Sequence, residues 1–177
     1  MILWTMGHST LPIDSFAAML LAHEIELLVD VRTVPRSRHN PQFNRDTLPG
    51  SLSAHGIGYL HMPGLGGLRH ARKDSLNTAW RNASFRGYAD YMATTEFASN
   101  LDDLARLADS QRVCIMCAEA VPWRCHRSLI ADALTARGLQ VRHILSVSAG
   151  KPHTLTPFAQ LDGTRVTYPG LPVPTQE

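Results

Sequence analysis

The most chemically varied part of the chain is residues 117–127, Cys-Ala-Glu-Ala-Val-Pro-Trp-Arg-Cys-His-Arg. This segment holds thiols, a carboxylate, an imidazole and guanidiniums, which are groups that serve as nucleophiles, acids, bases and anion ligands. It follows a short apolar run at 112–117, which predicts a buried strand, and precedes helical spacing at 126–137 that Gly138 closes. Reactive groups between the end of a strand and the start of a helix occupy the usual ligand crevice of an open α/β sheet.

The two cysteines of this segment allow three interpretations. In the first, Cys117 is a nucleophile, as in rhodanese-type sulfur transfer or cysteine phosphatases, and its pKa is lowered by the helix end and by neighbouring cations. Those cations are Arg124, His126 and Arg127. In the second, Cys117 and Cys125 join His126 and His8 around zinc, although no paired Cys-x-x-Cys knuckle is present. In the third, both are small buried residues, as Cys114 is on the strand.

Glu119 and His126 are the acid/base candidates of the segment. A carboxylate just past a buried strand either orders the nearby arginines through ion pairs or acts as a general base. An imidazole at the start of a helix is either a proton acceptor or a hydrogen-bonded packing residue. The sequence leaves both pairs of alternatives open.

Basic and amide side chains are concentrated at residues 30–45, which follow a second apolar run at 26–32. One interpretation is an anion-binding loop whose guanidiniums grip phosphates while Phe43 stacks on a base or closes a pocket. The other is a solvated loop in which Arg32 pairs with Asp30 and Phe43 fills the core. The ligand-binding candidates here are Asp30, Arg32, Arg36, Arg38, Asn40 and Gln42.

A glycine-rich segment lies at residues 64–69, Gly-Leu-Gly-Gly-Leu-Arg. It lacks the lysine and the spacing of a phosphate-binding loop, so it predicts only a sharp turn. Arg69 adds one more candidate guanidinium.

Strands alternate with helices along the chain. Strands are predicted at 2–7, 26–32, 56–61, 112–117 and 140–145, and helices at 11–25, about 44–54, 86–109 in two pieces, and 126–137. We therefore expect one α/β domain over residues 1–148, with a mostly parallel β-sheet flanked by helices on both faces. Residues 149–177 contain five prolines and predict a C-terminal strap or a partly disordered tail.

The amino-acid composition limits the class of protein to which the chain can belong. With 177 residues, 44% hydrophobic and 18% charged, the chain is typical of a soluble globular protein, and its net charge of +2 does not by itself indicate nucleic acid. Lysine occurs only at positions 73 and 151, so arginine dominates the cations. The absence of a membrane-length apolar run, a signal-like start and a disulfide-type cysteine pattern predicts a cytosolic protein without a membrane partner. The sequence identifies neither a cofactor nor an oligomeric state.

Seven short motifs carry a resemblance to a known family. They are Thr-Met-Gly-His-Ser at 5–9, Asp-Val-Arg at 30–32, Pro-Arg-Ser-Arg-His-Asn-Pro-Gln-Phe-Asn at 35–44, Leu-Gly-Gly at 65–67, Gly-Tyr-Ala-Asp-Tyr-Met at 87–92, Cys-Ala-Glu at 117–119 and Cys-His-Arg at 125–127. Together they resemble the domain-of-unknown-function family numbered 488, from about residue 3 to 147. The resemblance implies one site formed by His8, Asp30, Arg32, Arg36, Arg38, Asn40, Gln42, Glu119, Cys125, His126 and Arg127. A weaker architectural likeness to rhodaneses transfers no activity.

The function that these observations favour is an enzyme with an arginine-lined pocket for a phosphate-bearing substrate, such as a nucleotide or a nucleic-acid end. Its catalytic candidates are Glu119, His126, Cys117, Cys125 and His8. Its substrate-binding candidates are those of residues 30–45 together with Arg69, Arg124 and Arg127. One alternative is a nucleic-acid-binding module without catalysis, which needs arginines but no Cys, Glu and His cluster. Another is a thiol sulfurtransferase that carries a persulfide on Cys117.

The predicted parallel sheet has a geometric consequence. Residues 7–9, 30–32 and 117–119 all follow strands, so they should meet along one edge of the sheet. We therefore expect His8, Arg32, Glu119 and His126 to line a single pocket.

Overall fold

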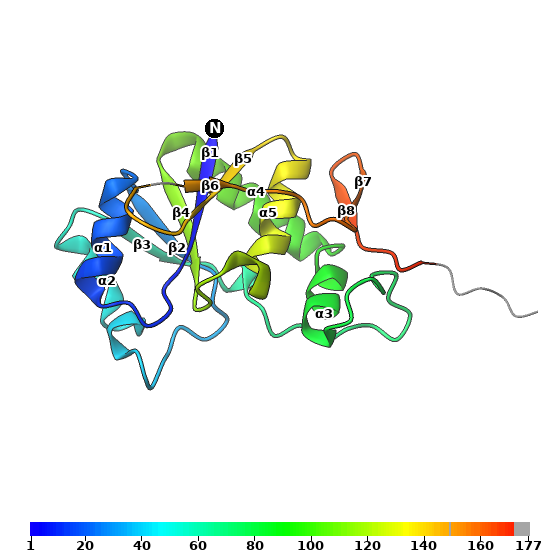
Figure 1. The fold of residues 1–177 in the computed structure, drawn as a ribbon, viewed down its shortest axis with the longest axis horizontal. Coiled ribbons are helices and arrows are strands. Elements are labelled where there is room, and N and C mark those ends of the chain that lie inside the picture. The colour runs from blue at the N-terminus through cyan, green and yellow to red at the C-terminus, as the bar shows by residue number, and fades with distance from the viewer. Residues whose placement is uncertain (149, 172–177) are drawn as a thin grey trace, which may run out of the picture.

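The main sheet of the protein has six strands in the order β3-β2-β4-β1-β5-β6 (Figure 1). The computed structural model describes residues 1–148 and 150–171. The strands are β1 (Ile2–Gly7), β2 (Leu27–Asp30), β3 (Gly58–His61), β4 (Val113–Cys117), β5 (Gln140–Ile144) and β6 (Gly150–Pro152). β1 to β5 pair in parallel, and only β6 is antiparallel to its neighbour. The predicted α/β domain with a mostly parallel sheet is thus confirmed.

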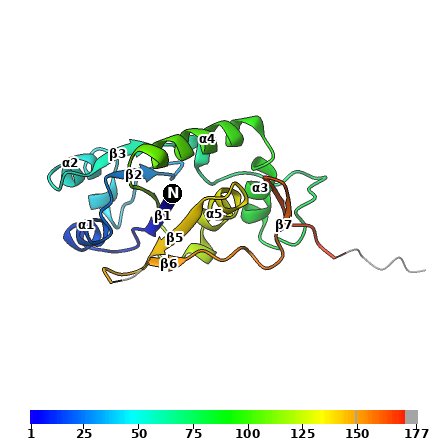
Figure 2. The same ribbon diagram turned by 90° about the horizontal axis from the view of Figure 1, so that it is seen from above.

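Helices cover both faces of the sheet, because alternate residues of the buried strands point to opposite sides. On β4, Met116 packs in one cluster with Phe16, and Ile115 packs in the other with Leu104. α1 (Ile13–Ala22) and α2 (Leu48–Ser53) lie on the first face, and α3 (Ala83–Tyr91), α4 (Thr95–Ser110) and α5 (Arg127–Ala136) on the second (Figure 2). The described residues also form the short 3₁₀ helices η1 (Pro41–Phe43), η2 (Pro63–Leu65) and η3 (Pro122–Arg124). No helix in the described part of the chain is long and apolar enough to cross a membrane.

Capping residues set where α3 and α4 begin. The side chain of Asn82 accepts hydrogen bonds from the backbone N–H groups of Ser84 and Phe85, so α3 starts earlier than the predicted residue 86. Thr94 caps α4 in the same way. The buried side of α4 is formed by Phe97, Leu101, Leu104 and Ala108.

The C-terminal part contains strands that the sequence pattern did not predict. β6 extends the main sheet beside β5, and β7 (Gln160–Asp162) pairs with β8 (Arg165–Thr167) in a separate antiparallel ribbon. Tyr168 follows β8 and is buried, and its hydroxyl donates a hydrogen bond of 2.7 Å to Asp132 of α5. Residue 149 and residues 172–177, which belong to the predicted strap or tail, lie outside the described residues.

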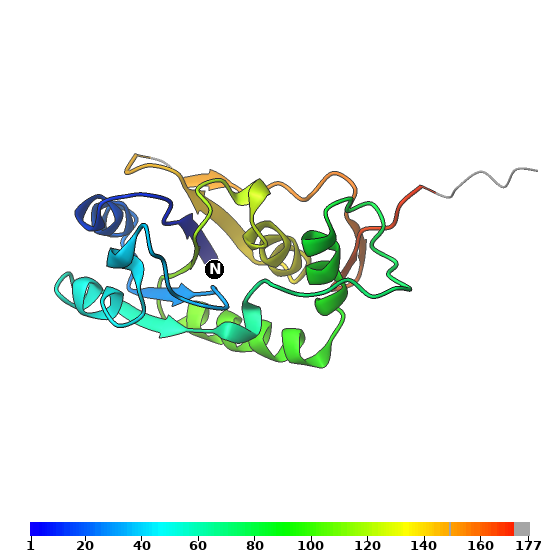
Figure 3. The same cartoon turned by 90° about the horizontal axis from the view of Figure 1, so that it is seen from below.

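The carboxyl ends of the central strands meet at one edge of the sheet. β1 and β2 flank β4, with Gly7 opposite Cys117 and Asp30 opposite Met116. The backbone continues this pairing past the strands, since the N–H of His8 donates to the carbonyl of Cys117 at 2.9 Å. Figure 3 looks onto this edge, where the loops after β1, β2 and β4 lie beside one another.

Candidate functional site

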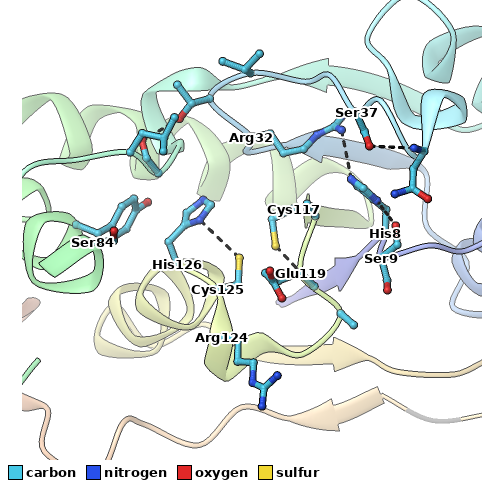
Figure 4. A pocket seen from close by; sticks show the side chains of 18 of the residues that line it. His8, Ser9, Arg32, Ser37, Ser84, Cys117, Glu119, Arg124, Cys125 and His126 are labelled. Carbon is cyan, nitrogen blue, oxygen red and sulfur yellow. Dashed lines mark hydrogen bonds between the residues drawn. The ribbon is translucent and has the colours of Figure 1, made fainter. Parts of the chain in front are cut away.

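A cavity of about 710 Å³ opens at this edge. Its walls come from the loops after β1, β2 and β4, from the turn after η2, and from α3 (Figure 4). Among the candidates from the sequence, those that line it are His8, Arg32, Arg36, Asn40, Cys117, Glu119, Arg124, Cys125 and His126. His8, Arg32, Glu119 and His126 thus share one cavity, as the strand-edge argument predicts.

Arg32 is held rigidly in the wall of the cavity. Its Nε and Nη2 donate to the two carboxylate oxygens of Asp30 at 2.9 and 2.7 Å, and Nη2 also donates to the carbonyl of Phe43 at 2.6 Å. Tyr59 donates to the same carboxylate at 2.6 Å. Asp30 is therefore a buried positioning residue that does not reach the cavity, and Nη1 is the part of Arg32 left to face His8.

His8 is oriented by contacts on three sides. Its Nδ1 donates to the carbonyl of Ser9 at 2.8 Å, and its Nε2 accepts from Arg32 Nη1 at 3.4 Å. Its ring stacks on Phe43 with 4.3 Å between centroids. Burial is the main cause that lowers the pKa of His8, and the charge of Arg32 lowers it further. Together these two effects outweigh the hydrogen bond to the Ser9 carbonyl and the charge of Asp30, which raise the pKa. A neutral His8 next to a fixed guanidinium follows from these contacts.

Cys125 and His126 form a thiol–imidazole pair just before α5. The Nδ1 of His126 lies 3.6 Å from the Sγ of Cys125, and Nε2 lies 3.1 Å from the carbonyl of Val31 (Figure 4). A carbonyl only accepts, so Nε2 carries a proton and Nδ1 is the atom that exchanges a proton with the sulfur. The imidazole packs on Tyr88 and close to Gly67, where a Cβ would lie only 3.3 Å from Nδ1.

The two sulfurs of the site have opposite protonation preferences. Burial raises the pKa of the Cys117 thiol, and its hydrogen bond with Cys125 and the nearby Cys125 charge raise it further. Burial also opposes ionisation of Cys125, but hydrogen bonds from Cys117 and His126 and the charges of His126 and Arg127 hold the pKa of Cys125 well below its usual range. The sulfur of Cys125 also accepts from the backbone N–H of Arg127 at 3.5 Å. Of the two sulfurs, Cys125 is therefore the one that its surroundings favour as a thiolate.

Arg127 lies beneath the cavity rather than in its wall. It is 1% exposed, and its Nη2 donates to the carbonyl oxygens of Glu119 and Ala120 at 2.9 and 3.4 Å. These bonds hold the loop between β4 and α5 in place. Arg127 acts through that loop and through its charge, and the prediction that it contacts the ligand directly is not supported by its position.

Glu119 is exposed in the cavity, and its carboxylate has no ion pair with any residue in the described ranges. The sequence allowed the Glu119 carboxylate to order the nearby arginines through ion pairs. In the structure, Arg127 instead donates a hydrogen bond to the backbone carbonyl of Glu119. The same backbone carbonyl oxygen packs directly against Gly7 of β1, because a Cβ at position 7 would lie only 1.6 Å from it. Glycine at position 7 is what allows the loop to approach, and the Glu119 carboxylate is left free for a ligand or a proton.

Several candidates lie outside the cavity. Arg38 is exposed to solvent, Gln42 donates to the carbonyl of Leu11 at 2.9 Å, and Arg69 stacks over Tyr91 at 3.6 Å while donating to the carbonyl of Gly66. The latter two side chains hold loops in place. Phe43 is fully buried, so the interpretation that it stacks on a base is wrong; it packs against His8 instead.

Arg124 lines the cavity but does not help to ionise the cysteines. Figure 4 shows its guanidinium pointing away from both sulfurs. The cations that lower the pKa of Cys125 are His126 and Arg127. Arg36, by contrast, is an exposed guanidinium in the wall supplied by the loop after β2.

The zinc alternative does not fit the arrangement. It needs His8 beside the two sulfurs, whereas the free nitrogen of His8 faces the Arg32 guanidinium. No group of three or more His, Cys, Asp or Glu side chains within residues 1–148 and 150–171 is placed to hold a metal ion.

One known protein family matches most of the chain. The family model described as "Domain of unknown function DUF488" matches residues 12–134. The chain belongs to the DUF488 family. No curated protein and no solved structure matches it. The DUF488 match includes the site from Arg32 to Arg127, whereas His8 precedes its first residue.

Behind the DUF488 site lies a buried network that the sequence did not predict. Arg127 Nη1 donates to Thr5 Oγ1 at 3.3 Å, and Thr5 Oγ1 lies 2.6 Å from His143 Nδ1. His143 Nε2 lies 2.9 Å from His153 Nδ1, and His153 Nε2 lies 2.8 Å from Asp132 Oδ1. Burial, the nearby His153 and other cations lower the pKa of His143 to about 3. The one signal for it in the sequence is Asp132, a carboxylate among the apolar positions of a helix.

Proposed function

We propose that this DUF488 protein is a cysteine-dependent enzyme in which the Cys125 thiolate is the nucleophile and His126 is its proton partner. The observation that carries the proposal is the 3.6 Å contact between Cys125 Sγ and His126 Nδ1, with His126 Nε2 fixed by the Val31 carbonyl. Nucleophile, base and orienting group in that order are the arrangement found in cysteine-dependent catalysis. A thiolate at the start of a helix is further favoured by the helix dipole.

The substrate that we propose is a small phosphate-bearing molecule, such as a nucleotide or a nucleic-acid end. A volume of about 710 Å³ is within the usual range for small-molecule sites. Arg36 and Arg124 are exposed at its walls, and within residues 1–148 and 150–171 neither guanidinium has an ion-pair partner, so both can pair with phosphate. The Glu119 carboxylate in the same cavity disfavours a phosphate in contact with the thiolate. We therefore assign the phosphate to the arginines as a handle, and place another electrophilic atom of the substrate at Cys125.

The proposed reaction begins with attack by Cys125 on that electrophilic atom. His126 Nδ1 holds the proton that the thiol has lost and returns it to the leaving group. Glu119 is the second acid/base group of the cavity, with its exposed carboxylate available to activate water or take up a proton. Arg32 and His8 form a rigid wall that positions the substrate.

Two alternative functions, a nucleic-acid-binding module and a sulfurtransferase, would need other features of this site. A nucleic-acid-binding module would need exposed arginines such as Arg38 but would not need an ionised Cys125. A sulfurtransferase with a persulfide on Cys117 would need that sulfur to be reactive, whereas Cys117 is 1% exposed and retains its proton. The thiol chemistry also calls for reduced cysteines, which a cytoplasmic location would provide.

Protection of Cys125 from alkylation tests both parts of the proposal. Iodoacetamide labelling is followed with and without adenosine monophosphate, in wild-type protein, in Arg36→Ala and in Arg38→Ala. The nucleotide should slow labelling of Cys125 in wild-type protein and in Arg38→Ala, whose guanidinium lies outside the cavity. Arg36→Ala should weaken that protection by about tenfold in nucleotide concentration, the loss expected for one charge-assisted contact. Equal protection in both variants, or none in wild-type protein, would overturn the assigned phosphate site.

A further inference from the structure

Cys117 and Cys125 are neighbours in space, although seven residues separate them in the chain. Cys117 is the last residue of β4, and Cys125 lies two residues before the first residue of α5. Both residues line the cavity. Both are free thiols that belong to the same packed cluster, and the charge of Cys125 helps to raise the pKa of Cys117. Figure 4 shows both sulfurs among the side chains that line the cavity.

The two sulfurs differ in their access to a ligand. Cys125 is 5% exposed and Cys117 is 1% exposed, and only Cys125 is next to an imidazole. The thiol of Cys117 donates instead to the carbonyl of Glu119, with 3.8 Å between sulfur and oxygen. An attacking sulfur at the cavity surface and a protonated sulfur behind it are the two parts of a dithiol exchange centre.

We infer that Cys125 and Cys117 form a dithiol pair that reduces small anionic disulfides, with Cys125 as the attacking sulfur and Cys117 as the resolving sulfur. The exposed guanidiniums of Arg36 and Arg124 in the cavity walls favour disulfides with carboxylates or other anionic groups. This activity goes beyond the proposed phosphate-linked reaction and rests on one part of it, the reactive thiolate of Cys125.

The exchange is balanced in two steps. The Cys125 thiolate attacks one sulfur of a disulfide RSSR, the bond between the two R-bearing sulfurs breaks, and one RS⁻ leaves with the electron pair. Cys117 then gives up its proton, which the departing thiolate takes, and its sulfur attacks Cys125 Sγ. This breaks the mixed disulfide and releases the second RS⁻. The organic disulfide gains two electrons, and the two cysteines lose two electrons as their own disulfide forms.

The third cysteine is a matched control. Cys114 lies on β4, three residues from Cys117, and therefore packs on the opposite face of the sheet, in the cluster with Phe16. It is fully buried and does not line the cavity. Cys114→Ser should leave the exchange unchanged.

The test uses dithiobis(nitrobenzoate), an aromatic disulfide with two carboxylates, in excess over fully reduced protein. Wild-type protein and Cys114→Ser should each release two thionitrobenzoates per chain, and mass spectrometry should show the loss of two hydrogen atoms with no retained adduct. Cys117→Ser should release one and retain one thionitrobenzoate on Cys125. Cys125→Ser should react at least about tenfold more slowly, because its remaining site thiol is buried and protonated.

The outcomes separate the inference from the proposed function. A fast wild-type reaction that leaves a stable adduct on Cys125 would overturn the dithiol pair while leaving Cys125 as the proposed nucleophile. A reaction of Cys125→Ser as fast as that of wild-type protein would overturn both. Peptide mapping that finds a Cys117–Cys125 disulfide would support the pair, whereas a disulfide that includes Cys114 would contradict it.

Discussion

The backbone N–H of Arg127 donates a hydrogen bond of 3.5 Å to the sulfur of Cys125, and the guanidinium of the same arginine is buried beneath the loop that carries that sulfur. Arginine stays protonated in proteins, and a buried charge is stable only when an opposite charge or hydrogen bonds compensate it. No carboxylate within residues 1–148 and 150–171 forms an ion pair with Arg127. The proposed thiolate of Cys125 supplies a negative charge near this guanidinium.

Replacement of Arg127 should affect both reactivity and stability. In Arg127→Met the pKa of Cys125 should rise, because a positive charge that favours the thiolate is lost. The free energy of unfolding should fall by about 2–4 kcal/mol, since the carbonyls of Glu119 and Ala120 lose their donor. The pH dependence of Cys125 alkylation and urea unfolding measure the two effects. Arg106→Met, on the exposed side of α4, is the control, and similar effects in both variants would contradict the assigned role.

Replacement of His126 should change reactivity with a smaller effect on the fold. His126→Asn removes the imidazole at 3.6 Å from Cys125, so the pH at which Cys125 alkylation is half-maximal should rise by about one unit or more. His55→Asn replaces an exposed histidine away from the cavity and should leave that pH unchanged. An unchanged midpoint in His126→Asn would remove the imidazole from the proposed mechanism.

The ionised Cys125 also predicts how stability depends on pH. Its pKa is lower in the folded protein than in the unfolded chain, so between the two values the unfolded chain binds one more proton. The stability that wild-type protein has relative to Cys125→Ser should therefore rise with pH up to about 8.5, by at most about 1.4 kcal/mol per pH unit, and should decline as pH falls toward the folded pKa. Chemical unfolding across this range measures the difference. A difference that shrinks as pH rises toward neutrality would contradict an ionised Cys125.

The buried histidine network predicts sensitivity to acid. The pKa of His143 is lowered by burial to about 3, so between that value and about 6.5 only the unfolded chain takes up this proton. Stability should fall as pH decreases through this range, and the fall should be less steep in His143→Gln. His55→Gln replaces an exposed histidine outside this network, serves as the control and should leave the slope unchanged. Equal slopes in wild-type protein and His143→Gln would show that His143 is not neutral in the fold.

Much of the fold could be predicted from local sequence, because its elements follow periodic burial. Met116 and Ile115 alternate between the two faces of β4, and Leu101 and Leu104 mark the buried side of α4. Strands β6, β7 and β8 are short and mostly exposed, so they carry no such period. Their pairing comes from tertiary contacts, such as the hydrogen bond from Tyr168 to Asp132.

The predicted parallel sheet also placed the candidate residues at one edge of the sheet. It did not predict which of their side chains point into the cavity. Nothing local distinguishes Arg36, which reaches the cavity, from Arg38, which faces solvent two residues later. The burial of Arg127 depends on Thr5, which is distant in sequence. The choice of Cys125 over Cys117 as the thiolate likewise depends on how the Val31 carbonyl fixes His126.

In the proposed mechanism Cys125 is an ionised nucleophile in the wall of the cavity. The most direct test measures the rate of iodoacetamide labelling of each cysteine against pH in the folded wild-type protein, with the modified peptides identified by mass spectrometry. Cys125 should react first and reach half its maximal rate at a pH well below about 8.5, the usual thiol pKa, while Cys114 and Cys117 stay protected. Labelling of Cys125 only near that usual pKa, or labelling of Cys117 ahead of it, would contradict the account.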